Sequence, residues 1–277
     1  MNSRWELVAQ ISDLHIKKPG ELAYQKVDTA AALTRCIDTL HALQPRPQLV
    51  VVSGDLVDTP APEEYEHLAR LLTPLELPLA VIPGNHDARA SLRATFPKQP
   101  YVRAEGALDL SIALEEIDLM LMDSSVPGTD YGELTEETLL WLDATLRCHP
   151  DRPALLFMHH PPFLTGIEHM DRQNLHNADE LGRVVQRHRR ARLIAAGHVH
   201  RSTHTIFAGV PASICPAPNH AVALDLSGAL PPSLKVEPPG LHLHAWDRLS
   251  KRLVTHFVPI GDFPGPYPFF AADGRQL

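Results

Sequence analysis

Five apolar segments of this 277-residue chain each end in a short polar motif, and few folds accommodate that arrangement five times. Residues 7–11, 49–52, 79–82, 154–158 and 193–196 are predicted strands, and helical patterns at 24–44, 61–72 and 178–190 lie between them. The motifs that follow the strands are Ser-Asp-Leu-His, Ser-Gly-Asp, Pro-Gly-Asn-His-Asp, His-His-Pro-Pro and Gly-His-Val-His. Ligands bind beyond the carboxyl ends of strands in open α/β sheets, so we expect the five motifs to converge.

Each motif has an ordinary interpretation when it is taken alone. Ser-Gly-Asp is a common turn after a strand, and His-His-Pro-Pro can be a loop stiffened by proline. Taken together, five motifs of ligand type after five apolar strands favour one shared site. The candidate residues are Asp13, His15, Asp55, Asn85, His86, His159, His198 and His200.

The donor types at these positions indicate a transition metal. Two carboxylates, several imidazoles and one amide oxygen suit Zn, Fe, Mn or Co, whereas Ca²⁺ and Mg²⁺ prefer mostly oxygen ligands. One carboxylate can bridge two ions in a two-metal hydrolase. We therefore expect two divalent ions, and the sequence leaves their identity open.

Net charge and cysteine content limit the other classes of function and partner. The formal charge of −8 disfavours a nucleic-acid polymer as the partner, since phosphate backbones are bound through excess Lys and Arg. The three cysteines are widely spaced and form no CxxC pair, which predicts neither a disulfide framework nor a thiolate zinc site. We find neither a signal-peptide pattern nor an apolar run of membrane-spanning length, so we expect a cytoplasmic protein without a membrane partner.

The motifs together resemble those of the calcineurin-like metallophosphoesterases. The matching residues are Asp13-Leu14-His15, Gly54-Asp55, Gly84-Asn85-His86-Asp87, His159 and Gly197-His198-Val199-His200. Within that superfamily, "VVSGD", "IPGNHD", "MDSS" and "MHHPP" are similar to bacterial glycerophosphodiesterases and class III cyclic-nucleotide phosphodiesterases. The resemblance covers residues 13–200 and extends more weakly to about 225. It implies an α/β fold of two mixed β-sheets sandwiched by helices.

The resemblance also implies roles for individual residues. One ion would take Asp13, His15, Asp55 and His200, and the other would take Asp55, Asn85, His159 and His198, with Asp55 as the bridge. Metal-bound hydroxide would attack phosphorus while His86 faces the substrate. In related glycerophosphodiesterases a histidine near the substrate lies in the loop that corresponds to Pro218-Asn219-His220, which makes His220 a substrate-binding candidate.

The expected function is hydrolysis of small organic phosphodiesters, with glycerophosphodiesters first and 3′,5′-cyclic nucleotides as the alternative. A DNA exonuclease of the same superfamily would need a basic groove and added segments, which the charge and length disfavour. A metal-free scaffold would have lost ligands, and this chain retains every ligand position.

Other predictions concern the parts outside the motifs. We expect a single domain over 1–277, with short late strands at 202–260 forming a second sheet. The Pro- and aromatic-rich tail from about 261 should pack over the domain or meet another subunit, and the latter predicts a homo-oligomer. Gly84 should permit a sharp turn, and His160 should point away from the ions. His169 is a candidate for the rim of the pocket, and His242 and His244 should be structural.

Overall fold

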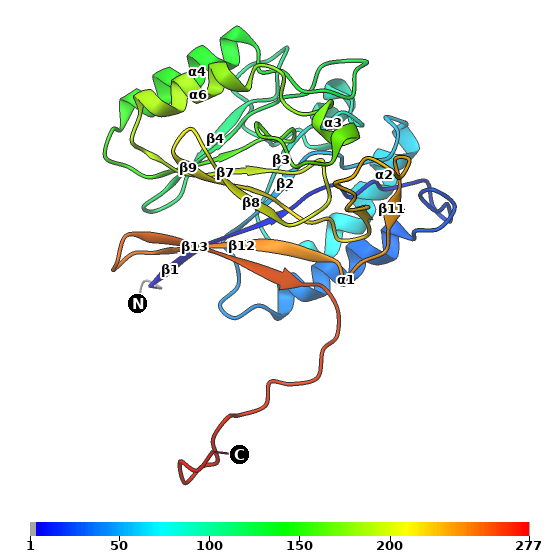
Figure 1. Cartoon of the computed structure of the whole chain (residues 1–277), viewed down its shortest axis with the longest axis vertical. Helices are drawn as coiled ribbons and strands as arrows, with labels where there is room; N and C mark the ends of the chain where they lie inside the picture. Colours follow the sequence, from blue (N-terminus) through cyan, green and yellow to red (C-terminus); the bar gives the residue numbers. More distant parts are fainter. Residues whose placement is uncertain (1–3, 277) are drawn as a thin grey trace.

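The computed structural model describes residues 4–276 and arranges most of their strands in two mixed sheets (Figure 1). The first sheet has the order β13 (Arg252–Pro259), β12 (Gly240–Asp247), β1 (Trp5–Ile11), β2 (Leu49–Ser53), β3 (Leu79–Ile82). The second has the order β4 (Leu110–Ala113), β5 (Asp118–Leu121), β6 (Ala154–Phe157), β7 (Ala191–Ala196), β9 (Val210–Ile214), β8 (Thr203–Phe207). Both sheets mix parallel and antiparallel pairs, which confirms the predicted fold class.

Parallel pairing decides where the loops after the strands lie. Strands β1, β2 and β3 are parallel to one another, as are β5, β6, β7 and β9 in the other sheet. Parallel strands need crossover connections, which helices supply here except between β7 and β9, where the chain passes through β8. The carboxyl ends within each sheet therefore share one edge, and the polar motifs follow those ends.

The helices are α1 (Thr29–Ala42), α2 (Pro62–Leu72), α3 (Arg89–Thr95), α4 (Glu136–Cys148), α5 (Glu168–Asp171) and α6 (Ala178–Arg187), with a 3₁₀ turn at Thr73–Leu75. Thr135 caps α4 through its side chain, as its sequence context indicates. The helix predicted over 24–44 begins only at Thr29. Tyr24 and Gln25 have φ of 51° and 58°, which no right-handed helix contains, and the Asp28 carboxylate caps the true start.

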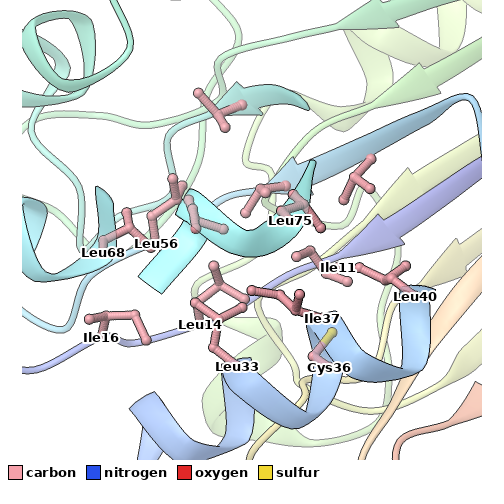
Figure 2. Packing of buried hydrophobic residues seen from close by; sticks show 14 of the residues in the cluster. Ile11, Leu14, Ile16, Leu33, Cys36, Ile37, Leu40, Leu56, Leu68 and Leu75 are labelled. Atoms are coloured by element: carbon pink, nitrogen blue, oxygen red, sulfur yellow. The ribbon is translucent and has the colours of Figure 1, made fainter. Parts of the chain in front are cut away.

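Three apolar layers hold the sandwich together. Helices α1 and α2 pack on the outer face of the first sheet through a cluster that includes Ile11, Leu33 and Leu68 (Figure 2). Helices α4 and α6 cover the outer face of the second sheet, and a third cluster, with Val51, Leu119 and others, lies between the two sheets. Both faces of each sheet are therefore largely apolar, and the predicted ligand motifs lie beyond the ends of the strands.

Contrary to the prediction, the late strands at 202–260 do not all join one second sheet. Strands β8 and β9 complete the second sheet, while β12 pairs antiparallel with β1 and β13 with β12 in the first. Only β10 (Ala221–Val222) and β11 (Leu234–Lys235) form a small ladder of their own. The β12–β13 hairpin gives β1 a second neighbour, and hydrophobic periodicity within a strand does not say which sheet it will join.

The C-terminal tail runs away from the body of the molecule in Figure 1. Phe263, Tyr267, Phe269 and Phe270 are all exposed, so the tail does not pack over its own domain, which was one of the two expected arrangements. None of the helices within residues 4–276 is both long enough and apolar enough to cross a membrane.

Candidate metal centre

The five predicted motifs meet at one edge of the sandwich, where the two sheets face each other. The Asp13 amide donates to the carbonyl oxygen of Gly54 at 3.0 Å, which joins the loops after β1 and β2. The Asp13 carboxylate accepts from the His198 amide at 2.9 Å, and the Asp55 carboxylate accepts from the His86 amide at 2.9 Å. The convergence predicted from strand ends is therefore present in the fold.

The backbone at this edge is strained at the predicted ligands. Asp13, His15, Asp55, His198 and His200 all have φ between 45° and 73°, in the left-handed region. A non-glycine residue there costs on the order of 1–3 kcal/mol and persists only where surrounding structure holds it. Such strain gathers at functional sites, and here it turns side chains from both sheets toward one point.

Two glycines allow the loops to approach each other closely. Gly54 has φ of 104°, and a Cβ there would lie 2.3 Å from Nδ1 of His159. A Cβ on Gly84 would lie 2.1 Å from Oδ1 of Asp55. The predicted turn is present, because the carbonyl oxygen of Gly84 accepts from the Asp87 amide at 3.4 Å, although the Gly84 backbone itself is not left-handed. Its role is to leave room for the Asp55 carboxylate.

Outer hydrogen bonds fix the orientation of two histidine rings. Nδ1 of His159 bonds to the carbonyl oxygen of Ser53 at 2.9 Å, and Nδ1 of His200 bonds to that of His220 at 3.3 Å. A carbonyl oxygen only accepts, so each Nδ1 carries a proton, and in its neutral form each ring presents an Nε2 lone pair inward. This is the usual arrangement of metal-binding histidines.

The inward atoms fit a cation. Nε2 of His15 lies 3.2 Å from Nε2 of His200, and Oδ2 of Asp55 lies 3.6 Å from Nε2 of His15 and 3.3 Å from Nε2 of His159. Oδ1 of Asn85 lies 3.2 Å from the same His159 nitrogen. Nε2 of His198 is buried without a hydrogen-bond partner in the described residues. Such closely spaced buried lone pairs are best satisfied by metal ions, and Asp55 is placed between the two histidine groups.

The pKa values of Asp13, Asp55 and His159 indicate that the buried carboxylates favour a positive charge beside them. Burial raises the pKa of the Asp13 carboxyl to about 6. Burial acts in the same direction on Asp55, yet His159 and His86 beside it hold its pKa well below the usual range. Burial lowers the pKa of His159, but Asp55 outweighs this effect and raises that pKa to about 9. Asp55 therefore stabilises a neighbouring cation even when that cation is an imidazolium.

A cavity of about 330 Å³ opens onto this edge. Seven of the predicted site residues line it: His15, Asp55, Asn85, His86, His198, His200 and His220. Asp13 and His159 are fully buried behind that wall, where they can hold an ion but cannot touch a substrate. His169, the candidate for the rim, also lines the cavity, as do residues 232–234.

The ring of His86 is oriented by a hydrogen bond to the backbone of the loop after β2. Its Nδ1 lies 2.7 Å from the carbonyl oxygen of Asp58, so Nδ1 donates and Nε2 is the ring nitrogen left for the cavity. Asp87 does not reach the cavity. Its carboxylate accepts from the amides of Gly84 and Leu56 and from the Tyr65 hydroxyl, which locks the loop that carries Asn85 and His86.

His160 lies closer to the site than the sequence indicates. Its Nδ1 pairs with the Ser124 hydroxyl at 2.8 Å, and its ring centroid is 4.8 Å from those of both His159 and His198. These three rings form one of the groups of side chains that could hold an ion. The prediction that His160 points away from the ions is wrong, because neighbouring side chains point to opposite sides only in an extended chain, and the chain bends after β6.

Two residues that the sequence did not single out belong to this region. Tyr24 lines the cavity, and its ring lies 5.2 Å from that of His220. Asp58 lies behind His15, with Oδ1 3.4 Å from Nδ1 of that ring. Asp58 follows Asp55 by three residues, which is a weak signal, while no local pattern marks Tyr24.

Comparison with known proteins gives consistent relatives. The sequence model of the family described as calcineurin-like phosphoesterase matches residues 7–202. A probable glycerophosphodiester phosphodiesterase GpdQ of Arcobacter nitrofigilis is 40% identical over 98% of this chain and 99% of its own length. A glycerophosphodiester phosphodiesterase GpdQ of Enterobacter lignolyticus is 32% identical, with 94% of each chain covered. A 3′,5′-cyclic-nucleotide phosphodiesterase of Nostoc is 29% identical over 81% of this chain and 84% of its own.

Solved structures support the fold alone. A dimetal phosphatase from Danio rerio has a TM-score of 0.64 at 14% identity, with 92% of this chain and 99% of that chain covered. A purple acid phosphatase from yellow lupin has a TM-score of 0.66 at 12% identity, with 100% of this chain and 53% of that chain covered.

Proposed function

This chain belongs to the calcineurin-like phosphoesterase family, and from that premise we propose that it is a metal-dependent hydrolase of small organic phosphodiesters. The observation that carries the proposal is the position of Asp55. Its carboxylate lies between His15 and His159, within 3.6 Å of an Nε2 atom on either side. That arrangement suits a carboxylate shared by two ions.

The residues divide into two groups around Asp55. Asp13, His15 and His200 would hold one ion, and Asn85, His159 and His198 would hold the other, with Asp55 common to both. An imidazole-rich set of this kind favours Fe, Mn, Zn or Co. When bound, such ions acidify coordinated water and neutralise charge on the phosphate oxygens.

Side chains that line the cavity would donate a proton and would contact the organic arms of the substrate. His86 lines the cavity together with Asp55 and Asn85, and its protonated ring can donate a hydrogen bond from Nε2 to a phosphate oxygen or to the departing alkoxide. The Asp58 carbonyl prevents that ring from turning, so the proton is presented at one place. His220 and Tyr24 also line the cavity, with ring centroids 5.2 Å apart, and they can contact an ester arm.

The extent of similarity favours glycerophosphodiesters as substrates. Similarity to the probable glycerophosphodiester phosphodiesterase runs through 98% of the chain, whereas similarity to the cyclic-nucleotide enzyme of Nostoc covers 81%. The lining of the cavity also extends beyond the ligand candidates to His169 and Ser233, which offers contacts for a second ester arm. 3′,5′-Cyclic nucleotides remain the second candidate because their hydrolases share the same motifs.

Assays with metal-reconstituted protein test both levels of the proposal. We expect bis(p-nitrophenyl) phosphate to have a higher kcat/KM than p-nitrophenyl phosphate, because a monoester dianion binds across two ions as a product does. Glycerophosphocholine or glycerophosphoethanolamine should be cleaved at least as well as cyclic AMP. A clear monoester preference would reject the diesterase proposal, and cleavage of cyclic AMP alone would favour the second candidate.

A homo-oligomer is proposed on separate grounds. The exposed aromatic side chains of the tail, Phe263, Tyr267, Phe269 and Phe270, lie away from their own domain and are available to a second copy. Light scattering of the full chain and of a chain ending at 261 tests this: the full chain should be the larger assembly, and a monomer in both cases would reject it.

A further inference from the structure

The loops after β1 and β2 run side by side beyond the sheet, and this brings Asp58 against His15. Residues 16 and 57 form an isolated parallel bridge, the Ile16 amide donates to the Leu56 carbonyl, and the Asp58 amide donates to the Ile16 carbonyl, both at 3.2 Å. The position of Asp58 is therefore set by backbone pairing that continues the sheet.

The Asp58 carboxylate is held between a cation and a ring. Oδ2 accepts from Nζ of Lys17 at 2.9 Å, and Oδ1 lies 3.4 Å from Nδ1 of His15. The latter distance is slightly longer than an ordinary hydrogen bond. Among the described residues, however, no closer partner satisfies this His15 nitrogen, which is buried. Asp58 is thus the acceptor available to it.

Lys17 is fixed rather than solvated, contrary to the usual state of a lysine after a strand. Its ammonium also lies 3.5 Å from Oε1 of Glu64, a carboxylate that is almost completely buried. The other oxygen of Glu64 accepts from the Thr59 amide at 2.6 Å. Asp58 is therefore supported on the side away from His15, and it cannot swing freely into solvent.

The same residue also acts through its backbone, since its carbonyl oxygen accepts from Nδ1 of His86 at 2.7 Å. We propose that Asp58 is a positioning residue for two imidazoles: its carboxylate, held by Lys17, orients His15 toward the ion site, and its carbonyl oxygen orients His86 toward the cavity. The proposal rests on the proposed metal site. His159 and His200 are oriented by neutral carbonyl oxygens, whereas His15 would be oriented by a charged carboxylate.

The two roles can be separated because a side-chain substitution removes only one. Asp58→Leu deletes the carboxylate and leaves the carbonyl that holds His86. Partners of this kind are worth 10- to 100-fold in metal affinity, so the ion that needs His15 should bind about 10- to 100-fold more weakly. The ion that needs Asn85 should bind as in the wild type, and excess metal should restore most of kcat.

The experiment is Co²⁺ titration of metal-free protein by visible absorption and calorimetry. His15→Ala and Asn85→Ala identify which binding step belongs to which group. Asp58→Asn, which keeps an acceptor oxygen without the charge, should fall between Asp58→Leu and the wild type, and Lys17→Met should cause a smaller loss. Glu21→Gln is the matched control, because Glu21 also lies 4.0 Å from Lys17 Nζ but does not contact His15.

Each outcome decides a different claim. If the wild type binds no Co²⁺, the proposed metal site itself is wrong. If the wild type binds two ions and Asp58→Leu binds both equally well, the role of Asp58 is rejected and the site stands. Loss of the Asn85-dependent ion instead would also reject it. Should Asp58→Leu fail to fold, Asp58→Asn is judged by the same criterion.

Discussion

Buried histidines occur in two regions of this molecule, and their neighbours make the difference between them. The edge histidines, His15, His159, His198 and His200, lie beyond the strand ends beside Asp13 and Asp55. The inter-sheet histidines, His242 and His244 of β12, are equally buried but lie between the two sheets. Burial of an imidazole therefore says little by itself about metal binding.

The inter-sheet histidines have neutral partners. Nε2 of His242 pairs with the Ser202 hydroxyl at 3.1 Å, and His244 pairs with the Thr255 hydroxyl at 2.9 Å and with the Gln10 amide oxygen at 3.2 Å. Burial lowers the pKa of His242 to about 3. The edge group instead contains a carboxylate that raises the pKa of His159. The comparison teaches that a buried carboxylate, shared among several rings, distinguishes a candidate ion site from a polar core.

Removal of the Asp55 carboxylate should have the largest effect on activity and on metal content. We expect Asp55→Ala to lower kcat/KM more than about 10³-fold and to reduce the bound metal per chain, because nucleophile activation and charge neutralisation are lost together. Gln10→Leu is the counterpart in the inter-sheet region and should lower stability while metal content stays unchanged. Elemental analysis and diester assays on both variants check this, and full activity in Asp55→Ala would break the comparison.

His86 tests the comparison from within the edge region, because it lines the cavity but is not one of the proposed ligands. His86→Ala should keep both ions and slow turnover by about 10²–10⁴-fold, as is typical when a positioned proton donor is lost. Metal content and kcat measured on the same samples decide the matter. If His86→Ala loses metal as fully as Asp55→Ala does, His86 is a ligand.

A third variant moves an edge histidine without changing its chemistry. In Gly54→Ala the new Cβ would meet the His159 ring, and φ of 104° is unfavourable for alanine. We expect a loss of about 2–4 kcal/mol in unfolding free energy, together with weaker metal binding. Gly209→Ala is the matched control: its φ is 82° but nothing lies within 4 Å, so only the backbone cost of about 1–2 kcal/mol should appear. Equal metal affinity in both variants would contradict the packing argument.

The smallest expected effect concerns the inter-sheet region at acid pH. The folded-state pKa of His242, about 3, is below its unfolded value near 6.5, so the native state binds fewer protons. Its contribution to stability is complete above about pH 6.5 and is lost as the pH falls toward 3. His242→Gln should weaken the fall in unfolding free energy between pH 6.5 and 5.5 by about 1 kcal/mol. Urea unfolding at several pH values measures this, with the exposed His256→Gln as control; identical slopes in wild type and His242→Gln would be the contrary result.

The sequence predicted the elements best where a pattern was local and strong. Strand β3 has the predicted bounds, because an apolar run acts over a few neighbouring positions. The start of α1, the sheet membership of β12 and β13 and the position of the tail were not predictable in this way. Each depends on backbone turns or on pairing with residues far away in the chain.

The sequence by itself determined the ligand residues of the candidate site and their places after strands, since both follow from residue type and hydrophobic pattern. The tertiary structure alone decided which ring nitrogens face inward, because the rings are turned by hydrogen bonds that they donate to the carbonyl oxygens of Ser53, Asp58 and His220. It also decided that His242 and His244 stand apart, and that Tyr24 and Asp58 belong to the site. These are matters of orientation and long-range contact, which only the packed chain can fix.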